Sequence, residues 1–401
     1  MSSKAKKEYL LAIKQRYRCA SKKERSALLN EVCLMCGFNR KYAIRVLNAP
    51  DNLPAKKKSG RPKRYVDPLL VDVLIRLLKA SNLICSKRLK QIIPLWLPHL
   101  EAAYHITLPH EIKQQILSIS AATIDRLVAS SRRKWKKIGF CTTKPGSLIK
   151  KHVPVKTDQW NERKPGFIEA DTVAHCGNSV SGQFAYSVNT VDIATGWIET
   201  RAVWGKGQQG VFSAIESIES ALPMPIVGFD ADNGGEFLNW HFLKYFTHRK
   251  RPVAYTRSRS YQKNDNAHIE GKNYTHIRQY LGYSRFESPK IVPLLNDLYT
   301  NEWSLFFNFF IPSSKIIAKD RIDGKIFKRH DIPQTPFQRL CNSPDISAKV
   351  VARLKRSLDS LNPFLLQELL ADKIKRILQL ATPEGLIAPS LINISTKKEK
   401  K

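Results

Sequence analysis

Acidic residues are scarce in this chain. Its 401 residues contain 34 Asp and Glu against 67 Lys and Arg, so the formal net charge is +33 at pH 7. This excess is far beyond what solubility requires, and its expected use is binding a polyanion. We favour nucleic acid, because the charge is dispersed through sequence of globular composition and is not confined to one amphipathic helix. A merely basic scaffold protein is the alternative.

Long apolar runs are also missing. The first seven residues, MSSKAKK, lack the apolar stretch of a signal peptide, and the apolar stretch at 303–312 is far short of a membrane span. We therefore expect no membrane partner. The expected location is the bacterial cytoplasm, in association with the nucleoid.

The cysteines form no disulfide framework. Their number is odd and their spacing irregular: Cys19, Cys33, Cys36, Cys85, Cys141, Cys176 and Cys341. We interpret them as reduced thiols. Cys33 and Cys36 form a C-x-x-C that could be half of a zinc site, but no second Cys or His pair lies nearby and the stretch has a helical pattern.

The length and composition predict several folded domains. Hydrophobic residues make up 42% of the chain and charged residues 25%, which is typical of globular protein. At roughly 150 residues per domain, two to four domains are expected. We predict a helix-turn-helix domain at 1–50, a basic linker at 51–66, a second helical DNA-binding region at 67–150, an α/β core at 151–320, and a connector with a small helical C-terminal domain at 321–401.

The first 64 residues are strongly basic, with 18 Lys and Arg against 4 Asp and Glu, a net of +14. Ser21 and Glu24 form a predicted capping box for a helix that Gly37 ends. A short basic helix follows, in which we expect Ala43, Ile44 and Leu47 to point inward. Arg40, Lys41 and Arg45 are expected to point outward. This is a helix-turn-helix pattern with a basic second helix. The alternative is a helical hairpin with a solvated charged face.

Residues 51–65 combine Pro, Gly and a charge run, which predicts an extended linker. Within it, GRP at 60–62 resembles the core of an AT-hook, in which Arg enters a narrow minor groove. The candidate DNA-binding residues here are Arg61, Lys63 and Arg64. Helical periodicity returns over 68–138, which suggests further DNA-binding helices.

β-Branched and aromatic residues alternate near 166–173, 184–191 and 197–203, predicting three strands of an antiparallel meander. A helix at 208–221, a buried strand at 226–229 and a helix at 236–246 should follow. Asp171 lies within the first strand. Asp232 ends the fourth against an Asn-Gly turn, in FDADNGGEF at 229–237. Glu270 lies in KNDNAHIEGKN at 263–273.

These elements and motifs resemble the ribonuclease-H-like core of insertion-sequence transposases and retroviral integrases. The stretch at 229–237 is similar to the integrase D-N-G-x-x-F signature, and that at 263–273 to the K-N-D-N-A-x-x-E-x-K-N block of transposases. The resemblance implies that Asp171, Asp232 and Glu270 are the catalytic, metal-binding acids of a polynucleotidyl transferase. They are separated by 60 and 37 residues, close to the spacing of such enzymes.

Acids from two strands and a helix would have to converge, because two divalent ions about 4 Å apart must both reach the scissile phosphate. Hard oxygen ligands suit Mg²⁺ or Mn²⁺. One ion would activate water, or later a 3′-hydroxyl, and the other would stabilise the leaving oxygen. The expected partners are the element's terminal repeats and target DNA, with the chain as a homo-oligomer when assembled on DNA.

Each acid also has an alternative role. Asp171 could face a turn, Asp232 could be a turn residue before Asn-Gly, and Glu270 could be a solvated helix position. Asp230 competes with Asp232, because residues two apart on a strand share a face. Asp192 and Glu236 are expected to serve turns and caps.

Basic residues surround the third acid. Arg257, Arg259, Lys263 and Lys272 would hold phosphates beside the ions, and a solvated basic face is the alternative. His268 is expected to be structural, and Asn266 and Asn273 could cap the helix or touch DNA.

At 303–312 the aromatic content predicts core packing, and 330–340 predicts an extended connector punctuated by proline. Amphipathic helices are expected at 347–361 and 363–380. We therefore expect a mobile-element transposase that cleaves DNA and transfers strands. The alternatives are another ribonuclease-H-like nuclease, such as a resolvase, and a DNA-binding regulator whose catalytic fold is inactive.

Overall fold

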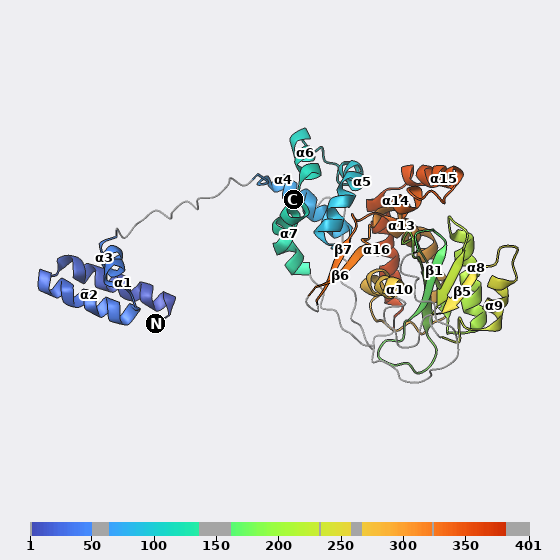
Figure 1. Ribbon diagram of the computed structural model, residues 1–401, viewed down its shortest axis with the longest axis horizontal. Helices are drawn as coiled ribbons and strands as arrows, with labels where there is room; N and C mark the ends of the chain where they lie inside the picture. Colours follow the sequence, from blue (N-terminus) through green and yellow to red (C-terminus); the bar gives the residue numbers. More distant parts are fainter. Residues whose placement is uncertain are drawn as a thin grey trace. The chain divides into compact units, whose positions relative to one another are not determined.

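A computed structural model of the chain describes residues 2–49, 64–135, 162–231, 234–257, 267–322 and 325–381. The chain divides into two compact units, Met1–Arg64 and Tyr65–Lys401 (Figure 1). None of the helices in these described ranges is long and apolar enough to cross a membrane. The finer division into five stretches stays a prediction.

The first unit consists of three helices, α1 (Ser3–Cys19), α2 (Lys22–Cys36) and α3 (Arg40–Asn48). The predicted capping box is confirmed: the Ser21 side chain accepts from the Glu24 backbone, and the Glu24 carboxylate accepts from the Ser21 backbone N–H at 2.8 Å. Gly37 ends α2 with a φ of 68°, a left-handed conformation that favours glycine.

Helix α3 packs on the first two helices through one face. Val32, Ala43 and Leu47 are fully buried. The prediction was wrong for Ile44, which is 38% exposed. The inward stripe of this short helix runs through the i, i+4 pair Ala43 and Leu47, and Ile44 is rotated about 100° from Ala43, towards its edge.

The second unit begins with four helices, α4 (Pro68–Ala80), α5 (Ser86–Tyr104), α6 (His110–Ser118) and α7 (Ala121–Trp135). The predicted helical character of 68–138 is confirmed for the described part, although α6 was not anticipated. These helices share one hydrophobic core with the α/β region that follows. The fully buried Trp96 on α5 packs edge-on against Phe306, Phe310 and Phe364, with ring centroids 6.0, 6.3 and 5.3 Å away.

The α/β region has the predicted order of elements: β1 (Phe167–Ala174), β2 (Ala185–Asp192), β3 (Ile198–Trp204), α8 (Gln208–Ala221), β4 (Gly228–Ala231), α9 (Trp240–Thr247), β5 (Ala254–Arg257) and α10 (Ala267–Lys272). The five strands form one sheet in the order β3-β2-β1-β4-β5. The first three strands are antiparallel, whereas β1, β4 and β5 are parallel.

Two element boundaries differ from the prediction. Strand β4 begins two residues late, because the N–H groups of Val227 and Gly228 both donate to the Gly166 carbonyl, and the regular pairing with β1 starts only at Gly228. Helix α9 begins four residues late, because the Asn239 side chain caps it by accepting from the Phe242 N–H at 3.1 Å.

Edge strand β3 is covered by side-chain amides. The Asn308 amide accepts from the Ile198 N–H at 2.9 Å and donates to the Ile198 carbonyl at 2.8 Å. Asn296 does the same for Ala202, at 2.7 and 3.0 Å. These contacts satisfy backbone groups that an open sheet edge would expose.

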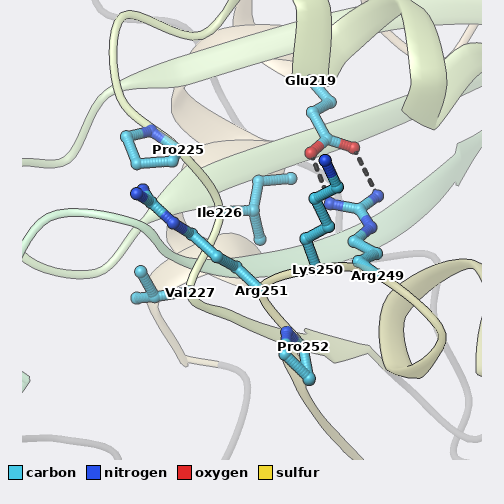
Figure 2. A pocket seen from close by; sticks show the side chains of 8 residues that line it. All are labelled: Glu219, Pro225, Ile226, Val227, Arg249, Lys250, Arg251 and Pro252. Carbon is cyan, nitrogen blue, oxygen red and sulfur yellow. Dashed lines mark hydrogen bonds and ion pairs between the residues drawn. The ribbon is translucent and has the colours of Figure 1, made fainter.

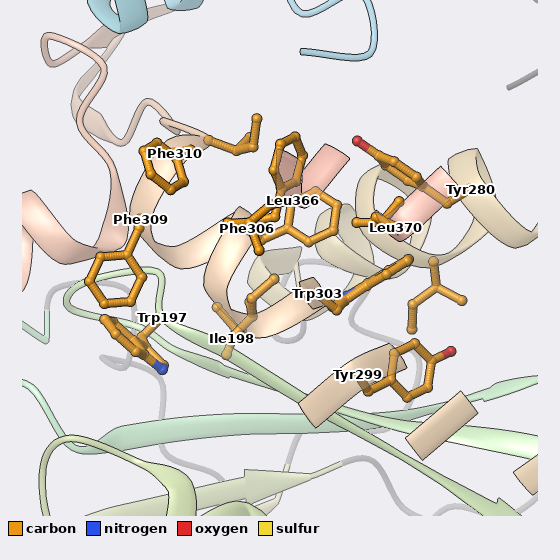
Figure 3. Packing of buried hydrophobic residues seen from close by; sticks show 14 of the residues in the cluster. Trp197, Ile198, Tyr280, Tyr299, Trp303, Phe306, Phe309, Phe310, Leu366 and Leu370 are labelled. Carbon is orange, nitrogen blue, oxygen red and sulfur yellow. The ribbon is translucent and has the colours of Figure 1, made fainter. Parts of the chain in front are cut away.

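Both asparagines come from a helical segment made of η2 (Asn273–Arg278), α11 (Gln279–Leu281), α12 (Ile291–Leu298), η3 (Tyr299–Trp303) and α13 (Ser304–Phe310), in which η marks a π-helical turn. Figure 3 shows the aromatic side chains of this segment packed beside Ile198. The fully buried Trp303 contacts the rings of Tyr280, Tyr299 and Phe307 at 5.3, 5.2 and 5.0 Å. The predicted core packing of 303–312 is confirmed.

The C-terminal part contains β6 (Ile316–Ile322), β7 (Lys325–His330), α14 (Pro336–Cys341), α15 (Ala348–Asp359) and α16 (Pro363–Gln379). The two predicted amphipathic helices are confirmed as α15 and α16. The strands β6 and β7 form a separate two-stranded ribbon that was not anticipated.

The extended connector predicted at 330–340 is wrong for its second half, which is helical. Thr335 and Gln338 form a capping box at the start of α14, and Pro336 occupies the first helical position, where its missing N–H costs nothing.

Two buried histidines should make the fold acid-labile. His175 stacks on Phe286 and His276 lies against Phe307, and burial lowers the pKa of both imidazoles well below 6.5. In the unfolded chain each ring binds a proton near pH 6.5, so the unfolded state gains protons first as the pH falls. Stability should therefore decrease below that pH, by up to about 1.4 kcal/mol per pH unit for each ring.

Denaturant unfolding at about pH 7 and about pH 5 measures this effect. His276→Phe should lose less stability between the two pH values than the wild type, whereas replacing the exposed His241 by Phe should leave the difference unchanged. Equal pH dependence of His276→Phe and wild type would contradict the assignment.

Candidate active site

Asp171 lies in the middle of the central strand β1, with its side chain half-buried. One carboxylate oxygen, Oδ1, accepts from the backbone N–H of Thr172 at 2.7 Å. The other, Oδ2, accepts from the Asn273 amide at 2.7 Å. Contacts to both oxygens restrict the rotation of this carboxylate.

A chain of polar side chains extends from Asp171 across the sheet. The Asn273 carbonyl oxygen accepts from the Asn189 amide at 2.8 Å, and the Asn189 carbonyl oxygen accepts from the Thr200 hydroxyl at 2.8 Å. Asn189 and Thr200 are buried on β2 and β3. Each of the two amides therefore donates one hydrogen bond and accepts another within this row of side chains. These bonds hold the Asn273 side chain in one orientation. The sequence suggested only capping or DNA contact for Asn273.

Glu270 lies on α10 with its side chain exposed. The residue before it, Ile269, is fully buried and donates its backbone N–H to the Glu169 carboxylate at 3.0 Å. Three residues after Glu270, Asn273 contacts Asp171. The helix is therefore tied to β1 on both sides of Glu270, once to Glu169 and once to Asp171.

Two further acids are buried beside these contacts. Glu169 pairs with Asp230 in the parallel register of β1 and β4, and both side chains are almost completely buried. Burial, together with the nearby Asp230 charge, raises the pKa of the Glu169 carboxyl to about 8, although the backbone N–H donors of Ile269 and His268 act in the opposite direction. Asp230 accepts from the Thr256 hydroxyl at 2.8 Å. No motif in the sequence singles out Glu169.

Glu236 lies closer to Asp171 than the sequence suggested. Its buried carboxylate accepts from the Thr172 hydroxyl at 3.2 Å and pairs with Lys206 at 2.6 Å. Asp192, in contrast, serves a turn as expected: it accepts from the backbone N–H groups of Gly166 and Thr195, both at 2.7 Å.

The candidate DNA-binding Lys and Arg residues differ in how far their side chains are exposed to solvent. Arg257 and Lys272 are half-buried on β5 and α10. Burial and, to a smaller extent, the charges of Arg88, Lys315 and Arg339 lower the pKa of the Lys272 ammonium to about 7.

In the first unit, the Arg40 guanidinium is bound to the Asn30 and Ser26 side chains of α2 at 2.5 and 3.0 Å. Arg45 lies over the Tyr42 ring, 5.0 Å from its centroid, and Lys41 and Arg64 are exposed. Asp232, Asn266, Arg61, Lys63, Arg259 and Lys263 lie outside the described residues.

Within the described ranges, His, Cys, Asp and Glu form no group of three or more that could hold a metal ion. Asp232 lies outside those ranges. The donors that are present, the carboxylate oxygens of Asp171 and Glu270, are of the chemical type that Mg²⁺ and Mn²⁺ prefer.

A basic pocket lies at the opposite end of the parallel strands, where residues 225–227 lead into β4 (Figure 2). Its lining residues are Glu219, Pro225, Ile226, Val227, Arg249, Lys250, Arg251 and Pro252. Arg249 binds both oxygens of Glu219, at 2.6 and 2.8 Å. Asp232 follows the other end of β4, so this pocket is separate from the candidate active site.

The five strands and the helix held against the central strand form a mixed α/β core, with the strand order β3-β2-β1-β4-β5 and an acid in the middle of β1. The chain belongs to the same family as the uncharacterized protein y4rM of Sinorhizobium fredii (strain NBRC 101917 / NGR234). The two are 35% identical over 340 residues, which cover 84% of this chain and 96% of that protein. No family model matches the chain.

Among solved structures, the chain is similar to the HTLV-2 integrase catalytic core domain in complex with magnesium, in its dimeric form. This match has 17% identity and a TM-score of 0.27, and covers 38% of this chain and 92% of that one. A simian T-cell lymphotropic virus intasome bound to the PP2A regulatory subunit B56 gamma matches with 13% identity and a TM-score of 0.29, covering 59% and 86%. The BIV integrase catalytic core domain matches with 12% identity and a TM-score of 0.25, covering 36% and 84%.

Replacing Asn273 by Leu should destabilise the protein by roughly 1–3 kcal/mol, because it leaves groups on Asp171 and Asn189 without a partner in a half-buried position. Denaturant unfolding measures the change. Asn301→Leu is the matched control, since Asn301 is exposed and its amide donates only to Asp297. Equal stabilities for the two variants would contradict a structural role for the polar chain.

Proposed function

We propose that this chain is the transposase of a mobile element. It binds the element ends, cleaves DNA in a metal-dependent reaction, and joins the 3′-hydroxyls to target DNA. Asp171, Asp232 and Glu270 are the proposed catalytic acids and metal ligands. Assembly on DNA as a homo-oligomer is part of the same proposal.

The observation that carries the proposal is the hydrogen bond between Asn273 and Asp171. It holds the helix of Glu270 against the strand of Asp171, so two acids that are 98 residues apart in the sequence belong to one local structure. A purely structural sheet has no need for a half-buried carboxylate on its central strand, held by a relay of two amides.

The register of β1 and β4 supports Asp232 over Asp230 as the second acid. Ala170 pairs with Ala231, and the next residue in each strand's sequence is an aspartate. Asp230 is fully buried and already accepts from Thr256, so it is poorly suited to reach a phosphate in solution.

The three carboxylates would hold two Mg²⁺ or Mn²⁺ ions, which when bound supply an activated water or 3′-hydroxyl and stabilise the leaving oxygen. The protein's own contribution is positional. Asn273 and the Thr172 N–H fix the Asp171 carboxylate, and Glu169 fixes the backbone beside Glu270. Prior orientation of this kind lowers the cost of reaching the reactive geometry.

Replacing any of the three acids by its amide should abolish DNA cleavage and joining but leave DNA binding intact. Asp171→Asn, Asp232→Asn and Glu270→Gln should each reduce cleavage and joining by at least about 10³-fold, while duplex affinity changes little. The assay incubates the full chain with element-end DNA and Mg²⁺ or Mn²⁺ and separates the products by size.

Asp230→Asn is the comparison variant, checked for folding by its thermal unfolding. Activity lost in Asp230→Asn and retained in Asp232→Asn would overturn the choice of the second acid. For the wild type, hydrolysis without joining would indicate a ribonuclease-H-like nuclease. Binding without either reaction would indicate an inactive regulator.

We also propose that α3 of the first unit contacts DNA through Lys41 and Arg45, whereas Arg40 serves mainly to attach α3 to α2. Lys41→Ala/Arg45→Ala should weaken duplex binding and lower the slope of log Kd against log salt by between about 1 and 2, because each lost phosphate contact removes about 0.9.

The matched control is Lys22→Ala/Lys23→Ala, which removes two exposed lysines from the start of α2. It should retain the wild-type slope. If the α3 variant keeps the wild-type slope as well, α3 does not contact phosphates.

A further inference from the structure

The ribbon formed by β6 and β7 is more basic than the protein around it. Residues 315–330 contain six Lys and Arg and two Asp, and both strands run through this segment. The ribbon forms its own two-stranded sheet, separate from the five-stranded sheet of the catalytic region. Figure 1 shows it as a distinct pair of strands outside that sheet.

Apolar side chains on the ribbon are exposed. Ile317 is 66% exposed and Phe327 is 50% exposed. Lys328 and Arg329 follow Phe327 and are also exposed, the Arg329 side chain by 70%. An exposed aromatic residue beside two exposed cations suits a surface that contacts both the phosphates and the apolar parts of a nucleic acid.

The ribbon is also poorly stabilised by itself. A lone two-stranded ribbon is marginally stable in water. The ion pair between Arg329 and Asp320, at 3.5 Å, is exposed on both sides and adds little stability. An anion bound along the ribbon would add contacts that the ribbon lacks by itself.

The base of the ribbon, in contrast, is firmly attached to the catalytic region. Asp331 accepts from the Lys315 backbone N–H at 2.7 Å and from the Arg339 guanidinium at 2.6 Å. The Lys315 ammonium donates to the carbonyls of Ile193 and Ala194 in the turn between β2 and β3. A ligand bound by the ribbon would therefore be held at a defined position relative to β1 and β2.

We propose that the ribbon β6–β7 is an arm that binds duplex DNA, with Lys328 and Arg329 on phosphates and Phe327 against the sugars or bases of a groove. This inference rests on the proposed function, because it takes DNA as the ligand. The major groove, about 12 Å wide, admits a two-stranded ribbon, and apolar side chains contact thymine methyls there. Charge complementarity favours duplex DNA over a second copy of the chain as the occupant, because the copy carries a net charge of +33 and DNA is a polyanion.

The test compares full-length variants binding a random-sequence duplex of about 30 base pairs without metal. At about 0.1 M salt, Lys328→Ala/Arg329→Ala should weaken binding roughly 10-fold or more and lower the slope of log Kd against log salt by between about 1 and 2. Phe327→Ala should weaken binding without changing that slope, because it removes no charge. The matched control, Lys355→Ala/Arg356→Ala, removes an adjacent exposed pair from α15 and should bind like the wild type.

A photo-crosslinking phenylalanine analogue at position 327 provides a second readout and should form an adduct with the duplex. The same analogue at Trp240, which is 75% exposed on α9, should not. Wild-type affinity of both ribbon variants, together with no adduct at 327, would overturn the arm while leaving the proposed function intact. Wild-type protein that fails to bind any duplex would overturn the proposed function itself.

Discussion

Polar groups buried in the central sheet must find hydrogen-bond partners, and the partners available in this chain come from distant segments. Asp171 is satisfied by Asn273, Glu169 by the backbone of Ile269, and the edge backbone of β3 by Asn296 and Asn308. Leaving a buried group unsatisfied costs about 1–3 kcal/mol, so each contact favours one placement of the helix that supplies it. The helix carrying Glu270 is positioned largely by this requirement.

Aromatic packing completes the arrangement by joining three segments around one core. Trp96 of α5 contacts rings of α13 and α16, and Trp303 contacts rings of α11, η3 and α13. Helices that the sequence suggests as a separate DNA-binding region are therefore fixed to the five-stranded sheet. If α4–α7 contact DNA, they do so as part of the same body as the candidate active site.

The fold of the α/β region could be predicted from local patterns. Alternation of apolar residues marked β1 to β3, and helical spacing marked α8 with its observed ends. Contacts within a few residues also followed from the sequence, such as the capping box of Ser21 and Glu24 and the turn formed by Asp192. The ribbon β6–β7 was missed because its alternation is obscured by charges on both strands, and α6 because its apolar stripe is short.

By itself, the sequence determined the order of strands and helices in the α/β region, the excess of basic charge, and the candidate acids Asp171, Asp232 and Glu270, because these depend on residue type and spacing. The tertiary structure decided which residues support those acids. Asn273, Asn189 and Glu169 gained their roles from contacts between elements up to about a hundred residues apart. It also showed that Arg40 binds α2 and that Asp230 is buried. These hydrogen-bond partners and burial depend on how strands and helices pack in three dimensions, which the spacing of residues along the sequence does not show.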